Sequence, residues 1–106
     1  MDGTTTLYAS QAVIQTVKAS GYLQQLCKHF AHKVPATWAA DSGRIDFAMG
    51  GCALTAPEGE DRQILAATAP SAEALARVEE VVGSHLARFA FREPLVIAWT
   101  RETPAA

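Results

Sequence analysis

Two stretches of the chain repeat apolar residues at the spacing of one helix face. The first predicts a helix over residues 21–33, with Ser20 placed as its N-cap. The second lies within residues 69–91, where Ser71 follows Pro70 as the N-cap and Glu73 occupies the favourable first turn. The two apolar stripes are Leu23, Leu26, Cys27, Phe30 and Val34 in the first helix, and Leu75, Val78, Val82, Leu86 and Phe89 in the second.

Beside these helices, short segments alternate apolar and polar side chains, as half-buried strands do. Turns at residues 41–43 and 50–51, and a loop at 57–61, separate four such segments and predict an antiparallel meander. Two further strands are expected, one around Val13 and Ile14 and one after Pro94. The six expected strands cover residues 8–16, 36–40, 44–49, 52–56, 62–69 and 95–100.

The resulting order, β-α-β-β-β-β-α-β, predicts an α+β fold with a mostly antiparallel sheet and both helices packed on one face. Trp99 is expected on the helix-covered face, in a structural role. The other face would carry small, weakly polar side chains, which fit a ligand platform, a homodimer interface or an ordinary half-exposed sheet. Its expected members are Ala48, Ala53, Thr55, Val96, Ala98 and Thr100, with Asp46 among the few charges.

Length and composition indicate one globular domain. A chain of 106 residues, 49% apolar and 19% charged, can bury roughly two-thirds of its unfolded-chain surface without disulfide bonds or a structural metal. We expect this domain to span residues 8–101, with flexible ends at 1–7 and 102–106.

Charge and the start of the chain exclude several classes of protein. The formal charge is 9 − 11 = −2, which is not the basic footprint that nucleic-acid binding needs. The first residues lack the pattern of a signal peptide and no run is long enough to span a membrane, so we expect a cytoplasmic protein without membrane partners. Cys27 and Cys52 are then expected to be free thiols.

The segment 26–33, LCKHFAHK, concentrates possible ligands. Residues two apart on a helix point away from each other, so Cys27 and His29 form no dyad, and Cys27 is expected in the core in a structural role. His29 and His32 are three apart and share a face, which makes them a candidate metal pair. A tight site needs a third ligand from elsewhere, and no CxxC or HExxH element supplies one, so solvated histidines are the alternative.

A second group of polar residues follows the second helix. His85 lies at the flank of the apolar stripe, and Arg88, Arg92 and Glu93 follow it. One interpretation is a structural network in which Glu93 pairs with His85 or an arginine at the helix-to-strand turn. The other is an anion pocket built from His85, Arg88 and Arg92, because a guanidinium suits carboxylate or phosphate.

Three segments together resemble a known family of small bacterial proteins, domain of unknown function family 2218, from about residue 11 onward. They are YLQQLCKHFAHK (22–33), GRIDFAMGGCALTA (43–56) and HLARFAFREPLVIAWT (85–100). The resemblance implies a stand-alone cytoplasmic protein of no established activity, an association of some members with siderophore or iron uptake, and a TATA-binding-protein-like arrangement, which does not carry DNA binding with it. The family pattern includes Tyr22, Cys27, His29, His32, Lys33, Gly43, Phe47, His85, Arg88, Phe89, Arg92, Glu93 and Trp99.

No glycine-rich phosphate loop, nucleophile elbow or acid–base pair is present, so we expect neither a catalytic residue nor a cofactor. The leading hypothesis is a small non-enzymatic binding or accessory domain, homodimeric, with a site for a small anion. The alternatives are a metal-binding protein or metal-dependent enzyme using His29 and His32, and a homodimeric module that pairs through the open sheet face. The candidate ligand-binding residues are His29, His32, His85, Arg88 and Arg92.

Overall fold

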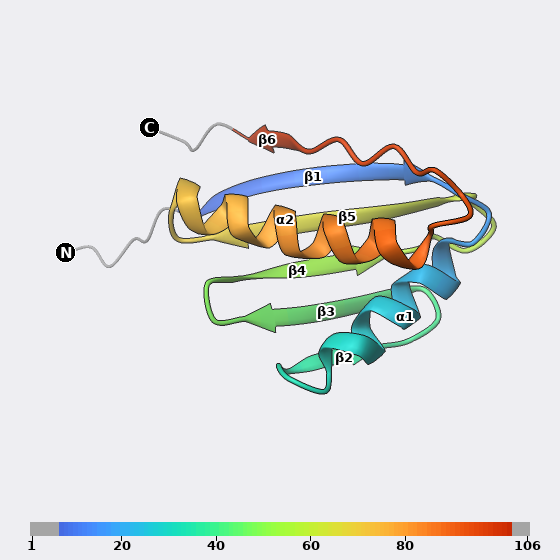
Figure 1. Ribbon diagram of the computed structural model, residues 1–106, viewed down its shortest axis with the longest axis horizontal. Helices are drawn as coiled ribbons and strands as arrows, with labels where there is room; N and C mark the ends of the chain where they lie inside the picture. Colours follow the sequence, from blue (N-terminus) through green and yellow to red (C-terminus); the bar gives the residue numbers. More distant parts are fainter. Residues whose placement is uncertain (1–6, 103–106) are drawn as a thin grey trace.

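The computed structural model describes residues 7–102 and contains one six-stranded sheet and two helices (Figure 1). Every strand pair is antiparallel, and the strand order across the sheet is β2-β3-β4-β5-β1-β6. The expected α+β class and element order are therefore confirmed. The elements are β1 (Tyr8–Gln15), α1 (Ala19–Phe30), β2 (Ala36–Trp38), β3 (Ser42–Phe47), β4 (Gly50–Thr55), β5 (Arg62–Ala69), α2 (Ala72–Phe89) and β6 (Thr100–Glu102).

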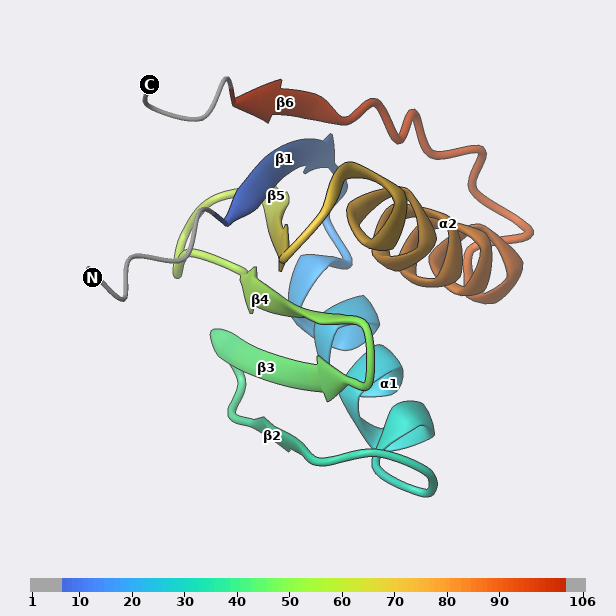
Figure 2. The same cartoon turned by 90° about the vertical axis from the view of Figure 1, so that its left-hand side faces the viewer.

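Both helices cover the same side of the sheet, as Figure 2 shows edge-on. The strands alternate as predicted: Ile45 of β3 lies opposite Cys52 of β4, and Leu54 opposite Leu65 of β5. These side chains are buried against the apolar stripes of α1 and α2. Burying an apolar stripe against an apolar sheet face is what holds the two layers together. Over residues 7–102, neither helix combines the length and apolar content needed to cross a membrane.

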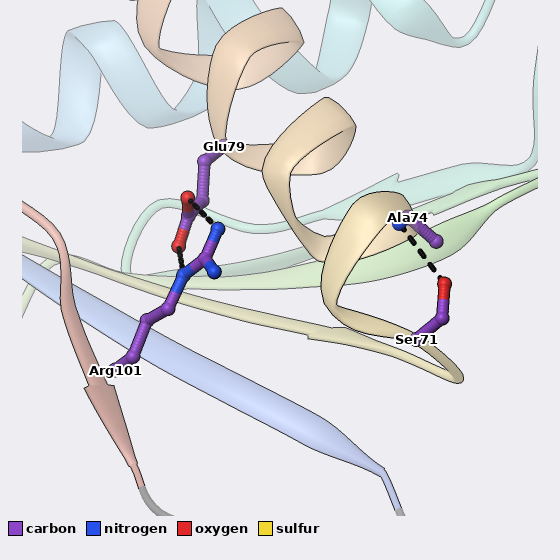
Figure 3. Close-up of polar contacts among 4 residues, drawn as sticks. All are labelled: Ser71, Ala74, Glu79 and Arg101. Atoms are coloured by element: carbon purple, nitrogen blue, oxygen red, sulfur yellow. Dashed lines mark hydrogen bonds and ion pairs between the residues drawn. The ribbon is translucent and has the colours of Figure 1, made fainter.

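The two helix starts differ. At α2 the prediction is confirmed, because the Ser71 hydroxyl accepts a hydrogen bond from the Ala74 amide at 3.1 Å (Figure 3). At α1 the prediction is wrong: the helix begins at Ala19, its N-cap is Lys18 without a side-chain bond, and Ser20 lies inside the helix. The Ser20 hydroxyl instead donates to the Ala40 carbonyl at 2.6 Å, so it ties α1 to the segment after β2.

The turns on either side of β3 lie earlier in the chain than predicted. At the second one, Gly50 is needed for close packing of two strands rather than for the turn itself. β3 already begins at Ser42, and Gly50 starts β4 while residues 48–49 form the turn. A Cβ atom at Gly50 would overlap the Thr68 carbonyl oxygen of β5 and the Ala69 side chain. Only glycine admits so close an approach of two elements.

The last strand is shorter and later than predicted. Alternation after Pro94 is correct, since Leu95, Ile97 and Trp99 pack against the core while Val96 and Ala98 are exposed. Regular pairing, however, begins only at Thr100, where β6 bonds to Ala9–Gln11 of β1. Glu102, expected in a flexible end, is the last residue of β6, and the expectations for residues 1–6 and 103–106 lie outside the described residues.

The open face of the sheet is more polar than predicted. Ala48 belongs to a turn, whereas Ala53 and Thr100 lie on the face as expected. One row across the sheet runs Arg44, Ala53, Ala66, Gln11 and Thr100. An exposed ion pair of Arg44 with Asp46, at 2.9 Å, occupies the β3 side of this face.

Candidate functional site

The last turn of α1 meets the C-terminal half of α2 through four aromatic rings, which we call the histidine corner: His29, Phe30, His85 and Phe89. The His29 and His85 ring centroids are 5.1 Å apart with the rings tilted by 41°. Phe30 lies 4.8 Å from His85, and Phe89 lies edge-on to His29 at 5.4 Å. Phe30 and Phe89 continue the apolar stripes that pack the helices, so the core fixes where the two imidazoles meet.

One imidazole in the corner has a defined hydrogen-bond partner. Nδ1 of His85 lies 2.7 Å from the Val81 carbonyl oxygen, one turn back on α2. A carbonyl only accepts, so in the neutral ring Nδ1 carries the proton and donates it. In that tautomer, the lone pair of His85 is on Nε2.

The other imidazole sits among positive groups. Its pKa is lowered from the ordinary value, first by partial burial and then by neighbouring charges, which belong to His85, Lys33, His32 and Arg88. Both causes disfavour the charged ring, so His29 is neutral at pH 7. The corner thus presents the neutral ring of His29 beside the permanent charges of Lys33 and Arg88.

A shallow hollow of about 240 Å³ opens beside the corner. Its lining contains potential cations, an amide and an aromatic ring, and no acid: Gln25, Lys28, His29, His32 and Phe89. A surface of this kind attracts anions.

The structure brings only part of the predicted site together. His29 contacts His85, and His32 lines the hollow with His29. Arg88 lies close enough to influence the charge of His29. Arg92 lies in the loop after α2, with its guanidinium carbon 5.2 Å from the ring centroid of Phe91.

Neither cysteine joins the corner. Burial raises the pKa of the Cys27 thiol to about 11 and that of Cys52 to about 12, so both remain protonated. Across residues 7–102, no three His, Cys, Asp or Glu side chains are grouped so that they could hold a metal ion. A closed zinc site of three or four protein ligands is therefore not formed by this part of the chain.

Glu93 has other partners than the expected histidine or arginine. Its carboxylate accepts hydrogen bonds from the Tyr22 hydroxyl at 2.8 Å and the Thr16 hydroxyl at 3.1 Å. Thr16 also accepts a bond from the Lys18 amide at 3.1 Å. This Glu93 network ties the chain after α2 to the start of α1, and burial together with Glu93 raises the pKa of Tyr22.

A second hollow, larger than the one beside the histidine corner, was not anticipated. It has a volume of about 740 Å³ and lies at the other end of α1, between the start of that helix, residues 39–41 and the loop 56–61. We call it the acidic hollow, because its lining includes Asp41, Glu58, Glu60 and Asp61 and no basic residue. Its walls come from three separate segments, so nothing in the local pattern of the loop distinguishes them from an ordinary solvated turn.

Comparison with known proteins identifies the family. The profile of family DUF2218, described as an uncharacterised protein conserved in bacteria, matches residues 11–100. The NMR structure of PA4090 from Pseudomonas aeruginosa is 34% identical to this chain and covers 88% of it and 95% of its own length, with a TM-score of 0.73. No curated protein matches the chain. The chain therefore belongs to the DUF2218 family.

Proposed function

We propose that this protein is a small non-enzymatic binding domain that takes a small anion at the hollow beside the histidine corner. The observation that carries this proposal is the composition of the lining, in which Lys28, His29 and His32 face the hollow and no acid does. Arg88, one turn after His85 on α2, adds a permanent charge nearby.

The size of the hollow restricts the ligand. About 240 Å³ is below the roughly 300–1,000 Å³ of sites that enclose drug-sized molecules. A carboxylate or phosphate group suits this volume, with Lys28 supplying charge, the Gln25 amide a donor and the Phe89 ring an apolar wall. Recognition would then involve one anionic group, with the rest of a larger ligand in solvent.

Titration of isotope-labelled protein with inorganic phosphate, in metal-free buffer at low salt, tests the proposal by NMR. We expect shift changes centred on Gln25, Lys28, His32 and Phe89. Lys28→Ala should weaken binding roughly two- to fivefold, as expected for one exposed charge contact. Lys18→Ala is the matched control, because Lys18 is an exposed lysine outside the hollow. Equal affinities for the two variants would refute the assignment of the site.

Three further expectations from the sequence stay predictions: a link to iron or siderophores, a metal site at His29 and His32, and a homodimer. An association with iron or siderophores rests on the family resemblance, and metal chemistry through His29 and His32 rests on their helical spacing. A homodimer formed through the open sheet face would involve Ala98, which is exposed. Ala98→Asp should then lower the mass measured by light scattering to that of a monomer, and an unchanged mass would eliminate that face.

A further inference from the structure

The contact between His29 and His85 brings together two potential metal ligands from different helices. Within residues 7–102 the His29 side chain makes no hydrogen bond, and His85 bonds only to the Val81 carbonyl. Aromatic packing accounts for the rings being adjacent, since Phe30 and Phe89 surround them. It does not require that both of the central rings be imidazoles.

The His85 ring is oriented as a metal-binding histidine is. In metal sites the nitrogen opposite the metal commonly donates its proton to a carbonyl or carboxylate, which fixes the tautomer and the direction of the coordinating lone pair. The 2.7 Å contact of Nδ1 with the Val81 oxygen supplies that arrangement within α2. Nε2 is then the coordinating atom.

The spacing of the rings fits one shared ion. A metal about 2.1 Å from a coordinating nitrogen lies about 3.2 Å from the ring centroid, so two imidazoles at a tetrahedral angle have centroids about 5.2 Å apart. The observed separation is 5.1 Å. His29 is exposed and can turn about its Cβ–Cγ bond to direct a nitrogen toward the ion.

We propose that His29 and His85 form an open two-imidazole site for a divalent first-row metal ion of the nickel, copper and zinc group, bridging α1 and α2. Imidazole nitrogens suit these ions, and affinity should follow Ni²⁺ < Cu²⁺ > Zn²⁺. Water completes the coordination, which is consistent with the lack of a third grouped ligand among the described residues. This pairing replaces the same-helix pair of His29 with His32.

The site does not rest on the proposed anion function, although both use the histidine corner. Lys28, Lys33 and Arg88 are repulsive to a cation, so an anion bound at the hollow would favour the metal. Testing each ligand in the absence of the other keeps the two proposals separate.

Calorimetric titration of tag-free protein with Zn²⁺ and Cu²⁺, in phosphate-free buffer, is the first measurement. We expect one ion per chain, with the association constant lowered at least about tenfold in His29→Ala and in His85→Ala and changed less than about twofold in the matched control His32→Ala. Loss in His32→Ala with retention in His85→Ala would overturn the proposal in favour of a same-helix pair. No saturable binding by the wild-type protein would overturn it outright.

A second measurement guards against variants that fail to fold. In the wild-type protein, histidine side-chain ¹⁵N spectra should show Zn²⁺ shifting Nε2 of His85 while its Nδ1 remains protonated. Coordination through Nδ1, or shifts confined to His29 and His32, would contradict the site without any substitution.

Discussion

The two ends of α1 differ in the kind of hollow that each one borders. At the N-terminal end lies the acidic hollow of about 740 Å³, with four carboxylates in its lining. At the C-terminal end lies a hollow one-third that size, beside the four aromatic rings of the histidine corner and with Lys28 but no acid in its lining. Volume alone would favour the acidic hollow as a binding site. The adjacent imidazoles and the lysine favour the smaller hollow.

The helix dipole explains part of this contrast. Acids near the N-terminus of a helix and bases near its C-terminus are both stabilised by the peptide dipoles. Asp41 and Asp61 near the start of α1, and Lys28 in its last turn, follow that rule. The dipole does not explain why α2 adds a second imidazole to the C-terminal end. The second imidazole, His85 of α2, is therefore the feature that the helix dipole does not account for, and it makes the C-terminal end of α1 a candidate site.

The largest expected effect comes from Glu93, beside the start of α1. Glu93→Ala removes the acceptor for the Thr16 and Tyr22 hydroxyls, whose residues are 4% and 7% exposed. Because both buried hydroxyls lose the acceptor for their protons, and Thr16 keeps only the bond from the Lys18 amide, the free energy of unfolding should fall by about 3 kcal/mol. Urea denaturation measures it, with Glu80→Ala, an exposed acid on α2, as the control.

The same variant sharpens the comparison of the two ends. If the Glu93 network is structural, folded Glu93→Ala protein should keep its affinity for Zn²⁺ and phosphate. A variant as stable as the wild type would show that the Glu93 network contributes no stability. A variant that folds normally but loses Zn²⁺ binding would show that the two ends of α1 are coupled.

A smaller effect is expected in the middle of α1, where the helix sits directly on β3. A Cβ atom at Gly43 would lie 2.7 Å from the Cys27 sulfur and 3.3 Å from the Thr37 carbonyl oxygen. Gly43→Ala should therefore cost about 2 kcal/mol by overpacking. Cys27→Ala removes the sulfur, so the double variant should lose less than the sum of the two single variants in urea denaturation. Strict additivity would mean that backbone strain, rather than the thiol, opposes a side chain at Gly43.

Sequence patterns predict a feature well when the residues that form it are close together along the chain, and poorly when they are far apart. The stripes of α1 and α2 and the alternation in β3 to β5 are local patterns, and they predicted the layers correctly. Ser20 was misassigned because its carbonyl partner, Ala40, lies outside the helix, in the segment between β2 and β3. Likewise, no local pattern pairs His29 with His85, or Glu93 with Thr16, which is 77 residues away. The residue types of the site were therefore visible, but their partners were set by packing.

At the histidine corner, binding and stability should separate. His85→Phe keeps a ring against Phe30 and His29 but loses the hydrogen bond to the Val81 carbonyl. That carbonyl is not left unpaired, because the Ser84 hydroxyl also donates to it. We expect the free energy of unfolding to change by less than about 1 kcal/mol while Zn²⁺ binding is lost. A loss above about 2 kcal/mol in urea would mean that the imidazole serves packing.

The smallest effect tests an ion pair whose residues line neither hollow. Arg101 of β6 holds Glu79 of α2 through two bonds of 2.9 and 3.2 Å (Figure 3), and Glu79 is the less exposed partner. Burial opposes ionisation of Glu79, but the two hydrogen bonds and the charge of Arg101 outweigh it, so the pKa of Glu79 lies below its ordinary value.

The sign of the pH dependence follows from that direction. A carboxyl whose pKa is depressed on folding contributes stability above its unfolded value, and the contribution is lost as the pH falls through the folded value. Glu79→Gln should therefore lower the urea midpoint at pH 7 and differ little from the wild type near pH 3. A difference that persists at pH 3 would assign the loss to packing between β6 and α2. Because neither end of α1 is involved, Zn²⁺ and phosphate binding at pH 7 should be unchanged in this variant, which makes it the reference for every substitution at the histidine corner.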